Sequence, residues 1–114
     1  MRRIAVTGGR NFINFITIRN AFKEIGLNEK DTLVHGGCYG CDQLCAEIAD
    51  KEFNAKIEEH PANWKKYGKA AGPIRNEEML KSNIDMLLAF RGGSGTDNCI
   101  KKAKELQIKV RRFY

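Results

Sequence analysis

The sequence predicts an α/β protein with a parallel sheet and helices on both of its faces. Short apolar runs alternate with segments of helical periodicity along the whole chain. Three of these runs, at 4–7, 32–35 and 86–90, end directly in glycine-rich turns. Strands that alternate with helices in this way make right-handed crossovers and form a doubly wound sheet. A chain of 114 residues has the size of one domain, 1–114.

The first strand, predicted at 4–7, runs into the turn Gly8-Gly9-Arg10. An arginine at the tip of such a turn can form a bidentate pair with a phosphate or carboxylate, or remain solvated as a loop residue. Apolar residues then bring the chain into a helix that reaches about Ile25. Gly26 follows, as is typical of a helix C-terminus.

The second strand, predicted at 32–35, is followed at once by Gly36-Gly37. Asp42 favours an N-cap for the helix that runs to about Phe53, and it could equally accept hydrogen bonds from a ribose or from the facing loop. His35 is expected to pack and hydrogen-bond locally, because no nucleophile or metal set accompanies it.

The third strand is predicted at 55–59, and the segment after it carries the only tryptophan, Trp64, among several lysines. We expect Trp64 to anchor in the core; the alternative is a loop in which aromatic and basic residues stack on a base and hold phosphates. Pro73 suits the first position of the next helix, which Ser82-Asn83 close.

The fourth strand, predicted at 86–90, is apolar throughout, as a buried strand of a parallel sheet should be. Glycines fill three of the four positions 92–95 of its turn, and Thr96 suits the N-cap of the following helix. Free N–H groups at that helix start favour an anion, usually a phosphate. A single glycine-rich turn of this kind also occurs in proteins where it binds no ligand. In this sequence, however, three such turns should lie together at one edge of the sheet. A fifth strand is predicted around Val110.

The charge is unevenly distributed. The net charge is +6, and residues 101–114 hold six basic side chains against one acidic. A basic flank can attract nucleic acid, although a solvated helix face is the commoner cause. No apolar run approaches the roughly 18 residues of a membrane span, and the N-terminal residues do not resemble a signal peptide. We therefore expect a cytosolic protein with no membrane partner.

The cysteine pattern does not favour a metal centre. Cys38-x-x-Cys41 and Cys45 lie close in sequence, but no second CxxC pair or suitably spaced histidine completes a zinc site. Cys41 and Cys45 fall four apart in a predicted helix, where they suit small buried side chains. We expect no metal, no cofactor and no disulfide.

Five motifs together carry a resemblance to a known family: Thr7-Gly8-Gly9-Arg10, His35-Gly36-Gly37-x-x-Gly40-x-Asp42, His60-Pro61-Ala62-x-Trp64, Ala71-Gly72-Pro73-x-Arg75-Asn76-x-x-Met79 and Gly92-Gly93-x-Gly95-Thr96. They resemble the YspA/YpsA-related branch of the SLOG superfamily, which also holds the LOG phosphoribohydrolases, DprA and nucleotide-sensing domains of bacterial defence proteins. The resemblance spans nearly the whole chain and is most specific at 60–79. It implies a Rossmann-like, three-layer α/β/α domain with about five parallel strands that binds a nucleotide or a nucleotide-derived signal.

The sequence departs from the LOG enzymes at two positions. Their signature is a proline-led glycine turn followed by a threonine and, three positions later, a catalytic glutamate. Arg91 stands here at the proline and Cys99 at the glutamate. A thiol cannot replace the carboxylate at neutral pH without a strongly lowered pKa. Asp97 and Asp42 remain as possible substitutes.

These observations favour a nucleotide-binding module that senses or sequesters a signalling molecule. The alternative is a LOG-like N-glycosidic hydrolase acting on a nucleoside monophosphate, with Arg75, Asp97 and Asp42 as catalytic candidates; a weaker alternative is a DprA-like DNA-binding protein. The resemblance also implies a homo-oligomer. The expected ligand-binding residues are Thr7, Gly8, Gly9, Arg10, His35, Gly36, Gly37, Asp42, Trp64, Arg75, Asn76, Met79, Gly92, Gly93, Ser94, Gly95 and Thr96.

Overall fold

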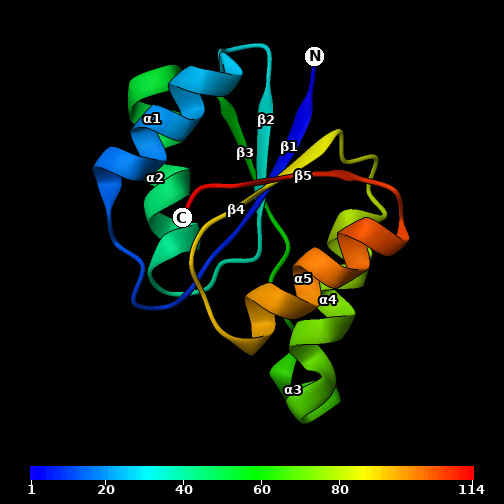
Figure 1. Cartoon of the computed structure of the whole chain (residues 1–114). Helices are drawn as coiled ribbons and strands as arrows, with labels where there is room; N and C mark the ends of the chain where they lie inside the picture. Colours follow the sequence, from blue (N-terminus) through cyan, green and yellow to red (C-terminus); the bar gives the residue numbers. More distant parts are fainter.

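The computed structural model describes residues 1–114 and confirms the predicted α/β fold. Five strands form one parallel sheet in the order β3-β2-β1-β4-β5 (Figure 1). The strands are β1 (Arg3–Thr7), β2 (Thr32–His35), β3 (Lys56–Glu59), β4 (Met86–Ala89) and β5 (Lys109–Arg112). From β1 the chain adds β2 and then β3 on one side of the sheet. It then adds β4 and β5 on the other side of β1. The strand order therefore reverses between β1 and β4, which is where ligands bind in folds of this type.

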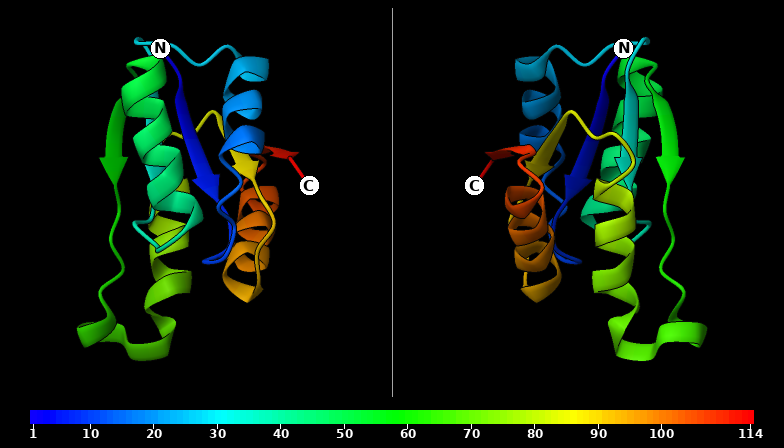
Figure 2. Two further views of the ribbon diagram at one scale, coloured as in Figure 1. Left: turned by 90° about the vertical axis from the view of Figure 1, so that its left-hand side faces the viewer. Right: turned by 90° about the vertical axis from the view of Figure 1, so that its right-hand side faces the viewer.

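Two pairs of helices cover the sheet, one pair on each face (Figure 1). The first pair is α1 (Phe15–Ile25) and α2 (Cys41–Phe53), and the second is α4 (Ala71–Leu80) and α5 (Ser94–Glu105). A short helix, α3 (Trp64–Tyr67), and a 3₁₀ turn, η1 (Gly68–Ala70), join β3 to α4. Figure 2 shows this connection beyond the carboxyl ends of the strands. None of the helices combines the length and apolarity that crossing a bilayer requires.

Alternation along the strands divides the core into two layers. Ala5 lies in register between Val34 of β2 and Leu87 of β4, and all three pack against α4 and α5. The neighbouring residues Ile4 and Val6 belong to the core on the opposite face, with α1 and α2. A central strand buried on both faces needs an apolar residue at every position, which explains the unbroken apolar runs of the sequence.

The predicted starts of the two helices on the second face, α5 and α4, are wrong. Helix α5 begins at Ser94 with Gly93 at the N-cap, so that Thr96 lies inside the first turn with a buried side chain. Helix α4 begins at Ala71, directly after η1, and Pro73 is its third residue rather than its first. Proline is tolerated there because the first-turn N–H groups of a helix lack intrahelical partners.

Candidate functional site

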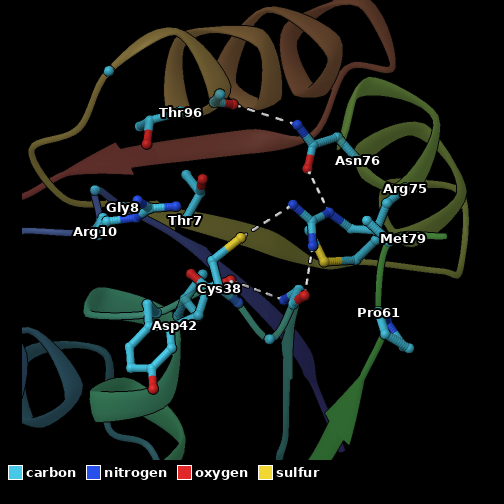
Figure 3. Close-up of a pocket in the computed structure, with 18 of the residues that line it drawn as sticks. Thr7, Gly8, Arg10, Cys38, Asp42, Pro61, Arg75, Asn76, Met79 and Thr96 are labelled. Atoms are coloured by element: carbon cyan, nitrogen blue, oxygen red, sulfur yellow. Dashed lines mark hydrogen bonds between the residues drawn. The ribbon is translucent and has the colours of Figure 1, made fainter. Parts of the chain in front are cut away.

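The three glycine turns meet at the carboxyl edge of the sheet, where they border a cleft of about 720 Å³ (Figure 3). Fifteen of the expected ligand-binding residues line it: Thr7, Gly8, Gly9, Arg10, Gly36, Gly37, Asp42, Trp64, Arg75, Asn76, Met79, Gly93, Ser94, Gly95 and Thr96. Six further residues complete the lining: Val6, Cys38, Tyr39, Glu59, Pro61 and Ala62. The cleft therefore extends from the turns after β1 and β4 to the segment after β3.

His35 and Gly92 do not line the cleft. The His35 ring is buried, and its Nδ1 accepts a hydrogen bond from the Gly37 N–H at 3.0 Å. Burial lowers the pKa of His35, which favours the neutral ring that this hydrogen bond requires. The predicted local role of His35 is confirmed. Gly92 packs instead against Gly9 and the Thr96 side chain, where a Cβ would overlap both.

The glycines of the cleft have two distinct roles. Gly9 donates its N–H to the Arg91 carbonyl at 2.9 Å, which brings the backbones of the first and third turns together. A side chain at Gly8 would overlap Cys41, and one at Gly36 would overlap Arg75. By contrast, a Cβ at Gly93 or Gly95 would meet nothing within 4 Å. The first group makes the packing possible, whereas the second leaves open space above the start of α5.

The N-terminus of α5 has no side-chain cap. Its first intrahelical bond joins the Asp97 N–H to the Gly93 carbonyl at 3.0 Å, and the N–H groups of residues 94–96 donate to no protein acceptor. Helix α1 differs, because the Asn14 side chain accepts from the Thr17 N–H. The start of α5 thus presents free donors and the positive end of the helix dipole to the cleft.

Arg75 connects the walls of the cleft. It extends from α4, is 9% exposed, and donates through Nη1 to the Gly36 carbonyl at 2.5 Å. Its Nη2 contacts the Cys38 sulfur at 3.4 Å, and its Nε donates to Asn76 Oδ1 at 2.9 Å. Asn76 in turn donates to the Gly95 carbonyl at 3.3 Å (Figure 3). This chain of contacts positions the second glycine turn relative to the start of α5.

Asp42 holds the second turn and does not cap its helix. The N-cap of α2 is Gly40, whose φ of 84° suits a residue without a side chain. Asp42 lies in the first turn of α2 instead, and its Oδ2 accepts from the Gly36 N–H at 3.0 Å and the Cys38 N–H at 3.4 Å. Burial raises the pKa of Asp42 to about 6, although these hydrogen bonds and Arg75 act in the opposite direction.

The carboxylates that line the cleft differ from those that the sequence suggested. Asp97 is exposed on α5 and does not line the cleft. Cys99, at the position of the LOG glutamate, is fully buried, and burial raises the pKa of its thiol to about 11. Asp42 and Glu59 are the two carboxylates of the lining. Sequence reasoning missed Glu59, although its place at the carboxyl end of a predicted strand was the signal that could have found it.

The expectation that Trp64 anchors in the core is wrong. The side chain is 58% exposed, because α3 lies beyond the edge of the sheet and packs on no core layer. Its ring lies against Gly72, where an added Cβ would be 3.4 Å from the indole. Trp64 therefore contributes an aromatic surface to the outer end of the cleft. Tyr39, which is 75% exposed, contributes a second one.

The basic C-terminal segment lies elsewhere. None of the six lysines and arginines of residues 101–114 lines the cleft. Arg111 is paired with Glu24 of α1. These charges therefore do not form part of the candidate site.

Comparison with known proteins agrees with this architecture. Residues 2–67 match the model of the YAcAr family, described as the YspA, cpYpsA-related SLOG family. The Gene 61 protein of Mycobacterium phage D29 is 34% identical over 125 residues, covering 99% of this chain and 97% of that protein. The X-ray structure of TM1055 superimposes with a TM-score of 0.71 and 17% identity, covering 96% of this chain and 72% of that one. At that identity, the structural match shows the fold alone.

Proposed function

Because this chain belongs to the YspA, cpYpsA-related SLOG family, we propose that its cleft binds a nucleotide or a nucleotide-derived signalling molecule. The glycine-rich turns hold the phosphate, and the domain acts as a sensor or a sequestering module. Family membership supports a nucleotide-related module, and the TM1055 structure supports its Rossmann-like fold. That the glycine-rich turns hold a phosphate is argued from the geometry of the cleft.

The observation that carries it is the open N-terminus of α5. Three backbone N–H groups at residues 94–96 have no protein acceptor, and the neighbouring Gly93 and Gly95 have no side chain that would cover them. A phosphate placed there would accept from these donors and interact favourably with the helix dipole. The turn Gly8-Gly9-Arg10 lines the same part of the cleft and adds an exposed arginine.

Two other features support an organic phosphate rather than a simple anion. The cleft volume of about 720 Å³ is in the range of small-molecule pockets and exceeds the needs of a single phosphate. The exposed ring of Trp64 at the outer end offers a surface on which a base can stack. Phosphate donors at one end and an aromatic surface at the other suit the two ends of a nucleotide.

Calorimetry with mono-, di- and cyclic nucleotides, together with mass spectrometry of small molecules retained through purification, tests the proposal. We expect one class of nucleotide to bind and to compete with inorganic phosphate. If no nucleotide binds and none is retained, the proposal fails.

A second candidate is the N-glycosidic hydrolase. It is favoured by Asp42 and Glu59, two carboxylates that line the same cleft as Arg75. Cleavage of the bond between base and ribose passes through a cationic sugar, which a nearby carboxylate stabilises. Release of free base from nucleoside monophosphates by the wild type, lost in Asp42→Asn or Glu59→Gln, would establish this activity. Binding without release would exclude it for the nucleotides tested.

A further inference from the structure

Two consecutive glutamates end β3, and their side chains differ in what they contact. Glu58 is fully engaged: its oxygens accept from Arg3 Nη1 at 2.9 Å and Nη2 at 2.6 Å, and His60 Nε2 lies 2.6 Å away. Glu59 is exposed and lines the cleft; it accepts no hydrogen bond and pairs with no cation of the protein. Its Oε2 lies so close to the Gly37 backbone that an added Cβ there would overlap it. Its acceptor capacity remains available to a ligand.

The strand order separates this carboxylate from the anion site. From β4, where the third turn begins, the sheet continues through β1 and β2 to β3, where Glu59 ends the strand. Three strand spacings put about 14 Å between the axes of β4 and β3, and a ligand spans less than this because the Glu59 side chain and the turn before α5 both line the cleft between them. A mononucleotide bound through its phosphate at α5, with its base near Trp64, would bring its sugar past the carboxylates of the cleft. The proposed ligand thus has hydroxyl donors in the part of the cleft where the protein has free acceptors.

Doubly wound folds that bind dinucleotides use a comparable arrangement. There, a carboxylate after the strand next to the first glycine turn accepts hydrogen bonds from the ribose hydroxyls. Here that neighbouring strand, β2, ends in His35, whose ring is buried and bound to Gly37. The next strand outward, β3, supplies Glu59 instead.

We propose that the Glu59 carboxylate accepts hydrogen bonds from the vicinal hydroxyls of a ribose, so that the cleft selects ribonucleotides over their deoxy counterparts. This inference rests on the proposed function, since it needs a nucleotide in the cleft. A carboxylate that accepts two neighbouring hydroxyls discriminates strongly, because a ligand that lacks one of them leaves an acceptor without a donor. It also repels a phosphate group at the 2′ or 3′ position of the sugar.

The test compares AMP, GMP, CMP and UMP with their 2′-deoxy and 3′-deoxy forms by calorimetry, on the wild type and on Glu59→Gln. The wild type should bind the ribonucleotide about 10- to 100-fold more tightly than either deoxy form, as expected for a hydrogen bond to a charged group. In Glu59→Gln, the ratio should fall to within a few-fold of one. The ratio is the readout, because removing a negative charge also raises the affinity for every phosphate.

Glu78→Gln is the matched control. This residue is exposed on α4, does not line the cleft, and its substitution removes the same charge. Its ribo-to-deoxy ratio should equal that of the wild type. Nucleotide binding with equal affinity for ribo and deoxy forms overturns the inference and leaves the proposed function standing. The inference also fails if Glu59→Gln keeps the wild-type ratio. If the wild type binds none of these mononucleotides, the inference fails. If it also binds no di- or cyclic nucleotide and none is retained through purification, the proposed function fails with it.

Discussion

Arg75 and Gly36 are 39 residues apart in the sequence, yet the guanidinium Nη1 of Arg75 donates to the Gly36 carbonyl at 2.5 Å. This contact joins α4 to the turn after β2. It requires glycine at position 36, because a Cβ there would overlap the guanidinium. The same arginine lines the cleft, so one side chain both holds a wall of the candidate site and supplies it with positive charge.

Substitution of Arg75 should therefore affect folding and binding together. Arg75→Ala leaves the buried Gly36 carbonyl without its donor, which should lower the free energy of unfolding by about 1–3 kcal/mol. Loss of a charge-assisted contact should weaken nucleotide binding about 10- to 150-fold. Arg75→Lys should recover part of the affinity but not the stability, because an ammonium cannot make three contacts in one plane. Urea unfolding and calorimetry measure the two effects. An Arg75→Ala protein that is unchanged in both would contradict this account.

The two classes of glycine predict opposite outcomes. Gly93→Val should fold normally, because an added Cβ meets no protein atom within 4 Å, and should weaken nucleotide binding at least about tenfold by covering the start of α5. Gly36→Ala should instead lower the free energy of unfolding by about 1–3 kcal/mol through overpacking against Arg75. Thermal unfolding and calorimetry on both variants separate the effects. Wild-type affinity in Gly93→Val would place the phosphate elsewhere.

Burial of Asp42 predicts a pH-dependent stability. The pKa of its carboxyl rises from 3.8 to about 6 on folding, so the folded protein holds this proton more tightly than the unfolded chain. Asp42 therefore contributes stability below pH 3.8, which is lost as the pH rises towards 6. Asp42→Asn has no such proton, so the free energy of unfolding of the variant relative to the wild type should rise between about pH 4 and 7, by up to about 3 kcal/mol.

Urea unfolding of the two proteins across that range measures this difference. His35 acts in the opposite sense, because its pKa is lowered on folding and its stabilising effect is lost as the pH falls. Taking the difference between wild type and variant removes this contribution. Glu59 and Arg75, which also influence Asp42, are present in both proteins. A difference that does not change with pH would show that folding does not raise the pKa of Asp42.

One cysteine of four should be reactive in the native protein. Cys38 is exposed and lines the cleft, whereas Cys41, Cys45 and Cys99 are buried. Burial also raises the pKa of the Cys45 and Cys99 thiols, which lowers their thiolate fraction. A thiol reagent should titrate one group in the native state and four after unfolding, and a bound nucleotide should slow the first reaction. Fewer than four reactive thiols after unfolding would reveal a disulfide.

The absence of a metal stays a prediction. Elemental analysis of the purified protein tests it directly. Zinc or iron in stoichiometric amount, lost in Cys41→Ser, would overturn it.

Much of the fold could be predicted because its signals are local. The apolar runs at 4–7, 32–35 and 86–90 match the observed strands to within one residue, since a strand buried on both faces admits few polar residues. The glycine turns and the start of α5 follow those strands directly in the sequence. The helix starts predicted at Thr96 and Asp42 were wrong, because the side chains that favour an N-cap also form hydrogen bonds at other positions.

By itself, the sequence determined the alternation of strands and helices, the parallel sheet and the edge at which three glycine turns meet. Only the tertiary structure decided which side chains share the cleft. Glu59 lines it and Asp97 does not, Trp64 is exposed, and Cys99 is buried. These outcomes depend on how α3, α4 and α5 are positioned relative to the sheet. That positioning comes from contacts such as Arg75 with Gly36, between residues far apart in the chain, and no local pattern encodes them.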